Sequence, residues 1–319
     1  MIACRNARFA LFLFAVFSWQ AAAGNNVPIL TPQKIAPNVY AFQGKAGVAS
    51  QDNRGFNSNA GFVITRDGVV VIDALGTPAL GKAMVAAIRK ITNKPIRKVI
   101  VTHYHADHFY GLQAFKQAGA EVWAHQAARE YLDGGEGAAR LQQRRGDLAP
   151  WVNEATRLVP ADVWIEGNRS FTLGGTQFDI IHLGPAHSPE DVIIVIGKSG
   201  VIFTGDILFT GRIPFVGEAD SKRWLETFSR LIELKPRIIV TGHGKPSHDP
   251  AVDLKLTRDY LIYLRQTMGK AVEGFVAFDE AYAQTDWTRF SNLPAFEGAN
   301  RINAYGTYLL MEKESLSRK

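Results

Sequence analysis

The densest group of metal-ligating side chains in this chain lies in the stretch from Lys98 to His108, K-V-I-V-T-H-Y-H-A-D-H. Its apolar run, Val99 to Val101, predicts a short buried strand. Directly beyond this strand come four side chains that can bind a metal ion: His103, His105, Asp107 and His108. Because open α/β sheets keep their binding residues at the carboxyl ends of strands, the pattern predicts a ligand cluster at a sheet edge.

Three more candidate ligands each follow a short apolar run later in the chain: His187, Asp206 and His243. Glycines stand beside most of them, as expected where the backbone turns sharply to aim a side chain inward. Imidazole and carboxylate donors without a thiolate suit zinc and are compatible with iron or manganese. Five histidines and two carboxylates exceed the needs of one tetrahedral ion, whereas two divalent ions that share a carboxylate would use all seven.

The apolar pattern also predicts the elements that position these donors. The first half of the chain indicates three strands, a helix and a strand: 38–43, 60–65, 69–72, a helix from Pro78, and the strand that leads to His103. The second half repeats this scheme with strands at 177–183, 192–196, 201–204 and 237–241 and a helix at 222–234. Two such halves predict an α/β fold in which two sheets lie face to face with helices outside.

A further strand is predicted at 121–124, and further helices at 112–118, at 126–145 with a glycine break, at 253–270 and at 300–315. The last of these places four apolar residues near one face, which predicts that this face packs against the domain: Ile302, Tyr305, Leu309 and Leu316. Residues 44–57 are rich in glycine and polar residues and predict a loop. Two interpretations of this loop stay open, a flap over the ligand cluster and a disordered hairpin.

The first 23 residues predict a secretory signal peptide. Arg5 and Arg8 precede the apolar run Phe9 to Trp19, which is short for a bilayer span, and three alanines offer a cleavage site. An uncleaved anchor is the alternative. Residues 24–319 are expected to form a single exported domain with a C-terminal helical extension, periplasmic if the host is Gram-negative. The only cysteine, Cys4, is removed with the leader, so the mature chain would contain no thiol.

The charge balance narrows the class of partner. The chain has 36 basic and 30 acidic residues, and loss of Arg5 and Arg8 leaves 34 minus 30, or +4. This small and dispersed surplus does not predict nucleic-acid binding. No second segment has the length and apolarity of a membrane span, so no membrane association is expected after the leader is removed. We expect a small-molecule substrate, and the sequence leaves the oligomeric state open.

The run T-H-Y-H-A-D-H, with Asp206 in T-G-D and His243 in G-H-G, resembles the metallo-β-lactamase superfamily over about residues 38–243. The resemblance implies a four-layer αββα sandwich with a dinuclear metal site between its two sheets. It implies that one ion is bound by His103, His105 and His187. It implies a second ion bound by Asp107, His108 and His243, with Asp206 bridging both. Asp73 matches the family's acid that orients the metal-binding loop.

The same resemblance implies an exported zinc-dependent hydrolase in which a metal-bridging hydroxide attacks a small ester, thioester, lactone or amide. Asp107 would bind metal and orient the hydroxide. Asp206 stands where one subclass of zinc β-lactamases has cysteine, so the site is more similar to glyoxalase II and lactonases, with β-lactam hydrolysis as a subcase. The leader and the tyrosine-rich tail loosely resemble branches associated with sulfur oxidation or quinoprotein pathways. A mononuclear iron oxygenase acting on sulfur compounds and a non-catalytic metal-binding protein are the alternatives.

Several polar residues outside this set have weaker patterns. His125 and His182 fall at or inside predicted strands, where capping or packing accounts for them better than a ligand role. Tyr104, Tyr110 and Arg212 lie within the ligand-bearing loops. We regard these three as candidates for substrate contact or for loop packing.

Overall fold

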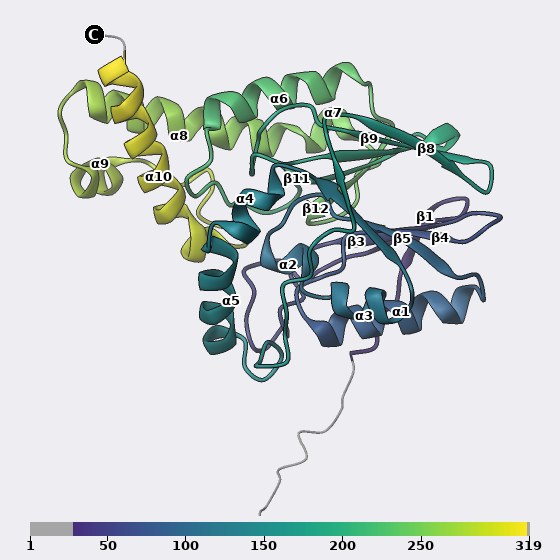
Figure 1. The fold of residues 1–319 in the computed structure, drawn as a ribbon. Helices are drawn as coiled ribbons and strands as arrows, with labels where there is room; N and C mark the ends of the chain where they lie inside the picture. The colour runs from purple at the N-terminus through teal and green to yellow at the C-terminus, as the bar shows by residue number, and fades with distance from the viewer. Residues whose placement is uncertain (1–27, 318–319) are drawn as a thin grey trace, which may run out of the picture.

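The computed structural model describes residues 28–317, and the predicted signal peptide lies outside the described residues (Figure 1). A seven-stranded sheet forms one half, with its strands side by side in chain order. Neighbouring strands from β1 to β4 pair antiparallel, and neighbouring strands from β4 to β7 pair parallel. The strands are β1 (Gln33–Ala36), β2 (Val39–Phe42), β3 (Ala60–Ile64), β4 (Val69–Ile72), β5 (Ile96–Ile100), β6 (Glu121–His125) and β7 (Val163–Ile165).

A five-stranded sheet forms the other half, in the order β12-β11-β10-β9-β8. Only β11 and β12 run parallel to each other. The strands are β8 (Arg169–Leu173), β9 (Thr176–Ile181), β10 (Ile193–Ile196), β11 (Val201–Phe209) and β12 (Ile238–His243).

Helices cover the outer face of each sheet, so the molecule has four layers. Figure 1 shows α1 and α3 against the first sheet and α6 and α8 against the second. Among the described residues, no helix combines the length and apolarity needed to cross a bilayer. The helices are α1 (Pro78–Ile91), α2 (Ala106–Phe109), α3 (Leu112–Gln117), α4 (Ala128–Asp133), α5 (Glu136–Asp147), the short 3₁₀ helix η1 (Gly197–Ser199), α6 (Ser221–Glu233), α7 (Pro250–Asp253), α8 (Lys255–Glu273), α9 (Phe278–Gln284) and α10 (Phe296–Ser317).

Three apolar clusters fill the spaces between the four layers. One cluster joins the first sheet to α1 and α3, through residues such as Phe62, Met84 and Phe115. A second lies between the sheets and includes Val70 and Phe203. The third joins the second sheet to the helices above it. Because each sheet is apolar on both faces, it needs a covering layer on each side, which confirms the predicted αββα sandwich.

Three strands were not predicted, and each lacks a strong local pattern. β7 has only three residues, and β8 is mostly exposed, so neither shows a clear apolar alternation. β1 has one buried residue in four. The alternating pattern of residues 38–43 favoured a strand at the edge of the sheet, but the edge position belongs to β1, and β2 lies inside the sheet.

The prediction for the C-terminal helix was wrong about its packed face. The four apolar residues expected to pack are 44 to 73% exposed: Ile302, Tyr305, Leu309 and Leu316. The face that meets α8 instead carries small and polar residues, among them Asn300, Asn303 and Ala304, which are fully buried. Asn300 accepts a hydrogen bond from Tyr260, and Asn303 donates one to the same hydroxyl, so polar groups on this face are satisfied within the interface.

Candidate metal centre

All seven predicted ligands meet at one edge of the sandwich, where the carboxyl ends of strands from both sheets come together. His103 and His105 lie in the loop after β5, and the short helix α2 carries Asp107 and His108. The second sheet supplies the remaining three from the loop after β9, from within β11 and from the end of β12: His187, Asp206 and His243.

The donor atoms form three overlapping groups, and within each group they lie no more than 4.8 Å apart. The groups are His103, His105 and His187; His103, His108 and Asp206; and Asp107, His108 and His243. The first and third groups are the two triads that the family resemblance implies. The middle group joins them.

Asp206 lies between the two triads, with its carboxylate facing both. Its Oδ2 is 3.5 Å from Nε2 of His187 and 3.2 Å from Nε2 of His243. Its Oδ1 is 3.2 Å from Nε2 of His108. Gly242 makes this position possible, since a Cβ there would lie 1.9 Å from Asp206 Oδ1.

Four of the five imidazoles are held by a hydrogen bond at Nδ1, which leaves Nε2 toward the centre. His108 donates to Asp73 Oδ2 at 2.9 Å, His187 to the Phe215 carbonyl at 2.9 Å, and His243 to the Asn57 carbonyl at 2.7 Å. His103 Nδ1 lies 3.1 Å from the Thr102 hydroxyl. A proton fixed on Nδ1 frees the Nε2 lone pair, which is the arrangement that metal-binding histidines require.

Burial keeps two of the imidazoles neutral. It lowers the pKa of His187 to about 3, with the neighbouring His105 acting in the same direction. Burial also holds the pKa of His103 well below its usual value. Neutral imidazole is the form that binds a metal ion, so both residues are in the required state across the physiological pH range.

The carboxylates at the centre are ionised. Burial alone would raise the pKa of Asp206, but His243 and His108 outweigh it and hold the pKa well below the usual value. Burial would also raise the pKa of Asp107, but His108 and His243 outweigh it and lower the pKa to about 2. The centre therefore combines two ionised carboxylates with the neutral imidazoles of His103 and His187, which favours a cation.

Several buried donor atoms also lack a hydrogen-bond partner among the described residues. They are Nε2 of His103, Nε2 of His108 and Oδ1 of Asp206. The last two atoms are 3.2 Å apart, but not in hydrogen-bond geometry. Unpaired buried polar atoms are costly, and here all three belong to predicted metal ligands. The residues therefore fit divalent metal ions, which would satisfy them.

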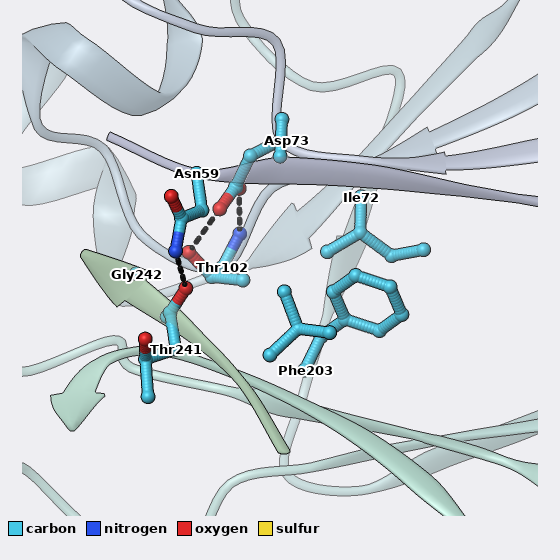
Figure 2. Close-up of a pocket in the computed structure, with 10 residues that line it drawn as sticks. Asn59, Ile72, Asp73, Thr102, Phe203, Thr241 and Gly242 are labelled. Carbon is cyan, nitrogen blue, oxygen red and sulfur yellow. Dashed lines mark hydrogen bonds between the residues drawn. The ribbon is translucent and has the colours of Figure 1, made fainter. Parts of the chain in front are cut away.

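Asp73 and Thr102 form the floor of the centre, beside a small pocket between the sheets (Figure 2). Asp73 Oδ1 accepts the Thr102 N–H at 2.8 Å, and Oδ2 accepts the Thr102 hydroxyl at 2.9 Å. The same Oδ2 accepts the hydrogen bond from His108. Asp73 has a left-handed backbone with φ of 60°, a conformation that Asp tolerates better than most residues. This geometry agrees with the orienting role expected for Asp73.

The weaker candidates separate clearly in the structure. His125 and His182 stack on each other with ring centroids 4.3 Å apart, and neither belongs to a donor group. Tyr104 is fully buried and its hydroxyl donates to the Val159 carbonyl, so it packs and does not face a substrate. Tyr110 is also fully buried. Arg212 is buried beside His243 and donates to the Gly47 carbonyl at 2.6 Å.

Residues 57–59 were not among the predicted site residues, yet they contact the centre from the loop before β3. Asn57 donates from Nδ2 to Asp107 Oδ2 at 2.9 Å, and the Ser58 hydroxyl donates to the Asp107 carbonyl at 2.5 Å. The only local signal is the polar run N-S-N before an apolar strand, which is common in loops.

Comparison with known proteins agrees with this geometry. Residues 53–243, which include all seven donors, match the family model described as the metallo-beta-lactamase superfamily. The chain belongs to the metallo-β-lactamase superfamily. Most members of this superfamily are hydrolases.

Two relatives from this superfamily differ in named activity. The chain is 24% identical over 260 residues to a metallo-beta-lactamase type 2 from Elizabethkingia meningoseptica, covering 79% of this chain and 95% of the relative. It is 22% identical over 234 residues to a linear primary-alkylsulfatase from a Pseudomonas species. That match covers 62% of this chain and 44% of the relative, so the chain spans less than half of the alkylsulfatase's length.

Solved structures show the same superfamily fold. The sec-alkylsulfatase Pisa1 from a Pseudomonas species superposes with a TM-score of 0.69 at 18% identity, covering 88% of this chain and 50% of that protein. A metallo-beta-lactamase from Pontibacter korlensis superposes with a TM-score of 0.57 at 20% identity, covering 73% of this chain and 99% of that protein.

Proposed function

We propose that this superfamily member is a dinuclear zinc-dependent hydrolase that acts on a small ester, thioester, lactone or amide. The observation that carries the proposal is the position of Asp206 between two complete triads of donors. A site for one ion would leave the donors of one triad buried without a function.

The bound ions would supply Lewis acidity and would lower the pKa of a coordinated water toward neutrality. The chain's own residues supply the rest. Asp107 is ionised at neutral pH, because its neighbours lower its pKa to about 2, so it can accept a hydrogen bond from a water molecule and orient that water. Its Oδ2 is 3.3 Å from His243 Nε2, which places it at the second triad. No cysteine is available as a nucleophile among residues 28–317.

The arrangement of the seven donors can be compared with the needs of the two alternative functions, an iron oxygenase and a non-catalytic metal-binding protein. A mononuclear iron oxygenase would need only one triad, and the pairing of His108 and His243 with Asp107 would then serve no ion. A protein that binds metal without turnover would use the same seven donors, so the substrate panel below is what separates it from a hydrolase. The oxygenase alternative is less well supported than hydrolysis.

A second candidate substrate class is an alkyl sulfate ester. It is supported by the alkylsulfatase relative and by the wider coverage of this chain in the sec-alkylsulfatase superposition, 88% against 73% for the Pontibacter β-lactamase. β-Lactam hydrolysis is supported by the Elizabethkingia relative. Export and a periplasmic location in a Gram-negative host remain proposals that rest on the predicted signal peptide.

A substrate panel tests the proposed function. Purified mature protein loaded with zinc would be assayed with nitrocefin, a lactone, a thioester and an alkyl sulfate, together with the variants Asp107→Ala and Asp279→Ala. Asp279 is a matched control, since its side chain is 83% exposed and pairs only with Arg301 at the surface. We expect at least one substrate to be hydrolysed by the wild type and Asp279→Ala and not by Asp107→Ala. Equal turnover by Asp107→Ala would show that the assigned role of Asp107 is wrong.

A further inference from the structure

Residues 57–59 connect the glycine-rich loop 44–57 to the ligand-bearing end of the second sheet. The Asn59 N–H donates to the Gly242 carbonyl at 2.6 Å. Its side-chain Nδ2 donates to the carbonyls of Thr241 and Gly244, both at 2.8 Å, and the first of these bonds is visible in Figure 2. The segment is thus fixed next to His243 by main-chain partners.

Asn57 itself contacts two predicted ligands of the same ion. Its side-chain Nδ2 donates to Asp107 Oδ2 at 2.9 Å, and its main-chain carbonyl accepts from His243 Nδ1 at 2.7 Å. Asp107 and His243 come from opposite halves of the sandwich. Among the described residues, no hydrogen bond joins Asn57 to His103, His105 or His187, the members of the other triad.

Both contacts select the form of the ligand that binds metal. The Asn57 amide presents its nitrogen to Asp107, so Asp107 Oδ2 is the acceptor in this bond. This bond uses one lone pair of Oδ2 and fixes the rotation of the carboxylate. At His243 the bond holds the proton on Nδ1 and leaves Nε2 free. The Asn57 amide oxygen is buried without a hydrogen-bond partner among the described residues, so Asp107 alone sets the orientation of the amide.

The loop before Asn57 is tied to the same half of the centre by a second contact. Arg212, which is 97% buried in the second half of the fold, donates from Nη1 to the Gly47 carbonyl at 2.6 Å. Its Nη1 lies 3.2 Å from His243 Nδ1. Since His243 Nδ1 already donates to Asn57, this second approach is not a hydrogen bond, and the guanidinium donates to the carbonyls of Gly47 and Ile213.

We propose that Asn57 is a positioning residue for the second metal ion, and that it acts by orienting Asp107. The proposal rests on the proposed dinuclear centre. The expected effect is confined to one of the two ion sites. Loss of the Asn57 side chain lowers zinc affinity at the half-site of Asp107, His108 and His243. It leaves zinc affinity at the half-site of His103, His105 and His187 unchanged.

The test measures zinc binding directly. Zinc would be titrated out of the mature protein with chelators of graded affinity, and bound zinc would be counted by mass spectrometry for the wild type, Asn57→Leu, Asn57→Asp and Asn53→Ala. Leucine and aspartate have nearly the size of asparagine, and neither can donate to Asp107. Asn53 is the matched control, since it bonds only within the loop, to Ser50, Val48 and Gly55.

We expect both Asn57 variants to lose affinity for one ion by about 10 to 100-fold, with the other ion and the control Asn53→Ala unchanged. In an Asp107→Ala background, Asn57→Leu should have no further effect, because its partner is gone. Wild-type affinity for both ions in the variants, or an equal loss at both half-sites, would overturn the proposal. If Asn57→Leu fails to fold, Asn57→Asp decides. Wild-type protein that binds two ions and hydrolyses nothing would contradict the proposed function and leave this result intact.

Discussion

Asp73→Asn is the substitution for which the structure gives the most detailed expectation. Three donors converge on the Asp73 carboxylate: the Thr102 N–H on Oδ1, and the Thr102 hydroxyl and His108 Nδ1–H on Oδ2. Asparagine keeps the size of the side chain and tolerates the left-handed backbone at this position. It has only one acceptor oxygen, however.

The Thr102 N–H cannot change its role, so the remaining oxygen must face it, and the new NH₂ group replaces Oδ2. The hydroxyl of Thr102 can rotate and accept a hydrogen bond. His108 can accept one only by moving its proton from Nδ1 to Nε2, the atom that faces Asp206. Metal binding would then have to reverse this tautomer. We expect a loss of affinity of about 10 to 100-fold at the half-site of His108, which corresponds to about 1.4–2.7 kcal/mol.

The assay is zinc competition with a chromophoric chelator at fixed pH. Asp179→Asn serves as the control, since Asp179 is a partly buried acid of strand β9 that bonds Ser170 and Gln177 and belongs to no donor group. Affinities for both ions within twofold of the wild type in Asp73→Asn would refute the assignment of Asp73 as the residue that sets the tautomer of His108.

Four further outcomes are expected. Burial alone would lower the pKa of His108, but Asp206 and other nearby acids raise it well above the usual value, so His108 is protonated at neutral pH in the metal-free protein. Zinc must displace this proton, so zinc affinity should rise about tenfold per pH unit until that pKa is passed. Calorimetry in two buffers should detect the released proton. The same raised pKa contributes stability to the metal-free protein below about pH 6.5, and thermal melts should show this contribution lost as the pH rises through the folded-state value. Gly242→Ala places a Cβ against Asp206 Oδ1 and should lower zinc content, measured by mass spectrometry, while Gly119→Ala, at an exposed turn, should not. Asn303→Leu leaves the Val216 N–H unpaired in the interior and should reduce the free energy of unfolding by about 1–3 kcal/mol in urea melts.

The predictable part of the fold follows from local patterns. The strand before His103 was evident because three apolar residues stand directly before a run of polar donors, and the order of such strands sufficed for the two-sheet sandwich. The short strands β7 and β8 were missed because they are partly exposed and are defined by pairing with neighbours and not by their own pattern. In α10, a regular apolar stripe predicted the wrong face, since helix packing here depends on small residues and on buried amides such as Asn303.

The candidate site was also only partly predictable from the sequence. The seven donors were identifiable because their residue types are unusual at strand ends. Their supporting partners were not, because each acts across a long sequence separation. Asn57 meets Asp107 across 50 positions, and the Phe215 carbonyl accepts the hydrogen bond that orients His187 from 28 positions away. A carbonyl or an amide has no sequence pattern that identifies such a partner. Asp73 was found only because the family resemblance pointed to it.

The central claim is that the seven donors hold two ions that share Asp206. The most direct test is to count metal by mass spectrometry in mature protein purified without added metal and then reconstituted with zinc, for the wild type and Asp206→Ala. The account predicts about two ions per wild-type chain and a clear loss in the variant. A wild-type chain that takes up a single iron ion, or that binds zinc equally well without Asp206, would contradict it.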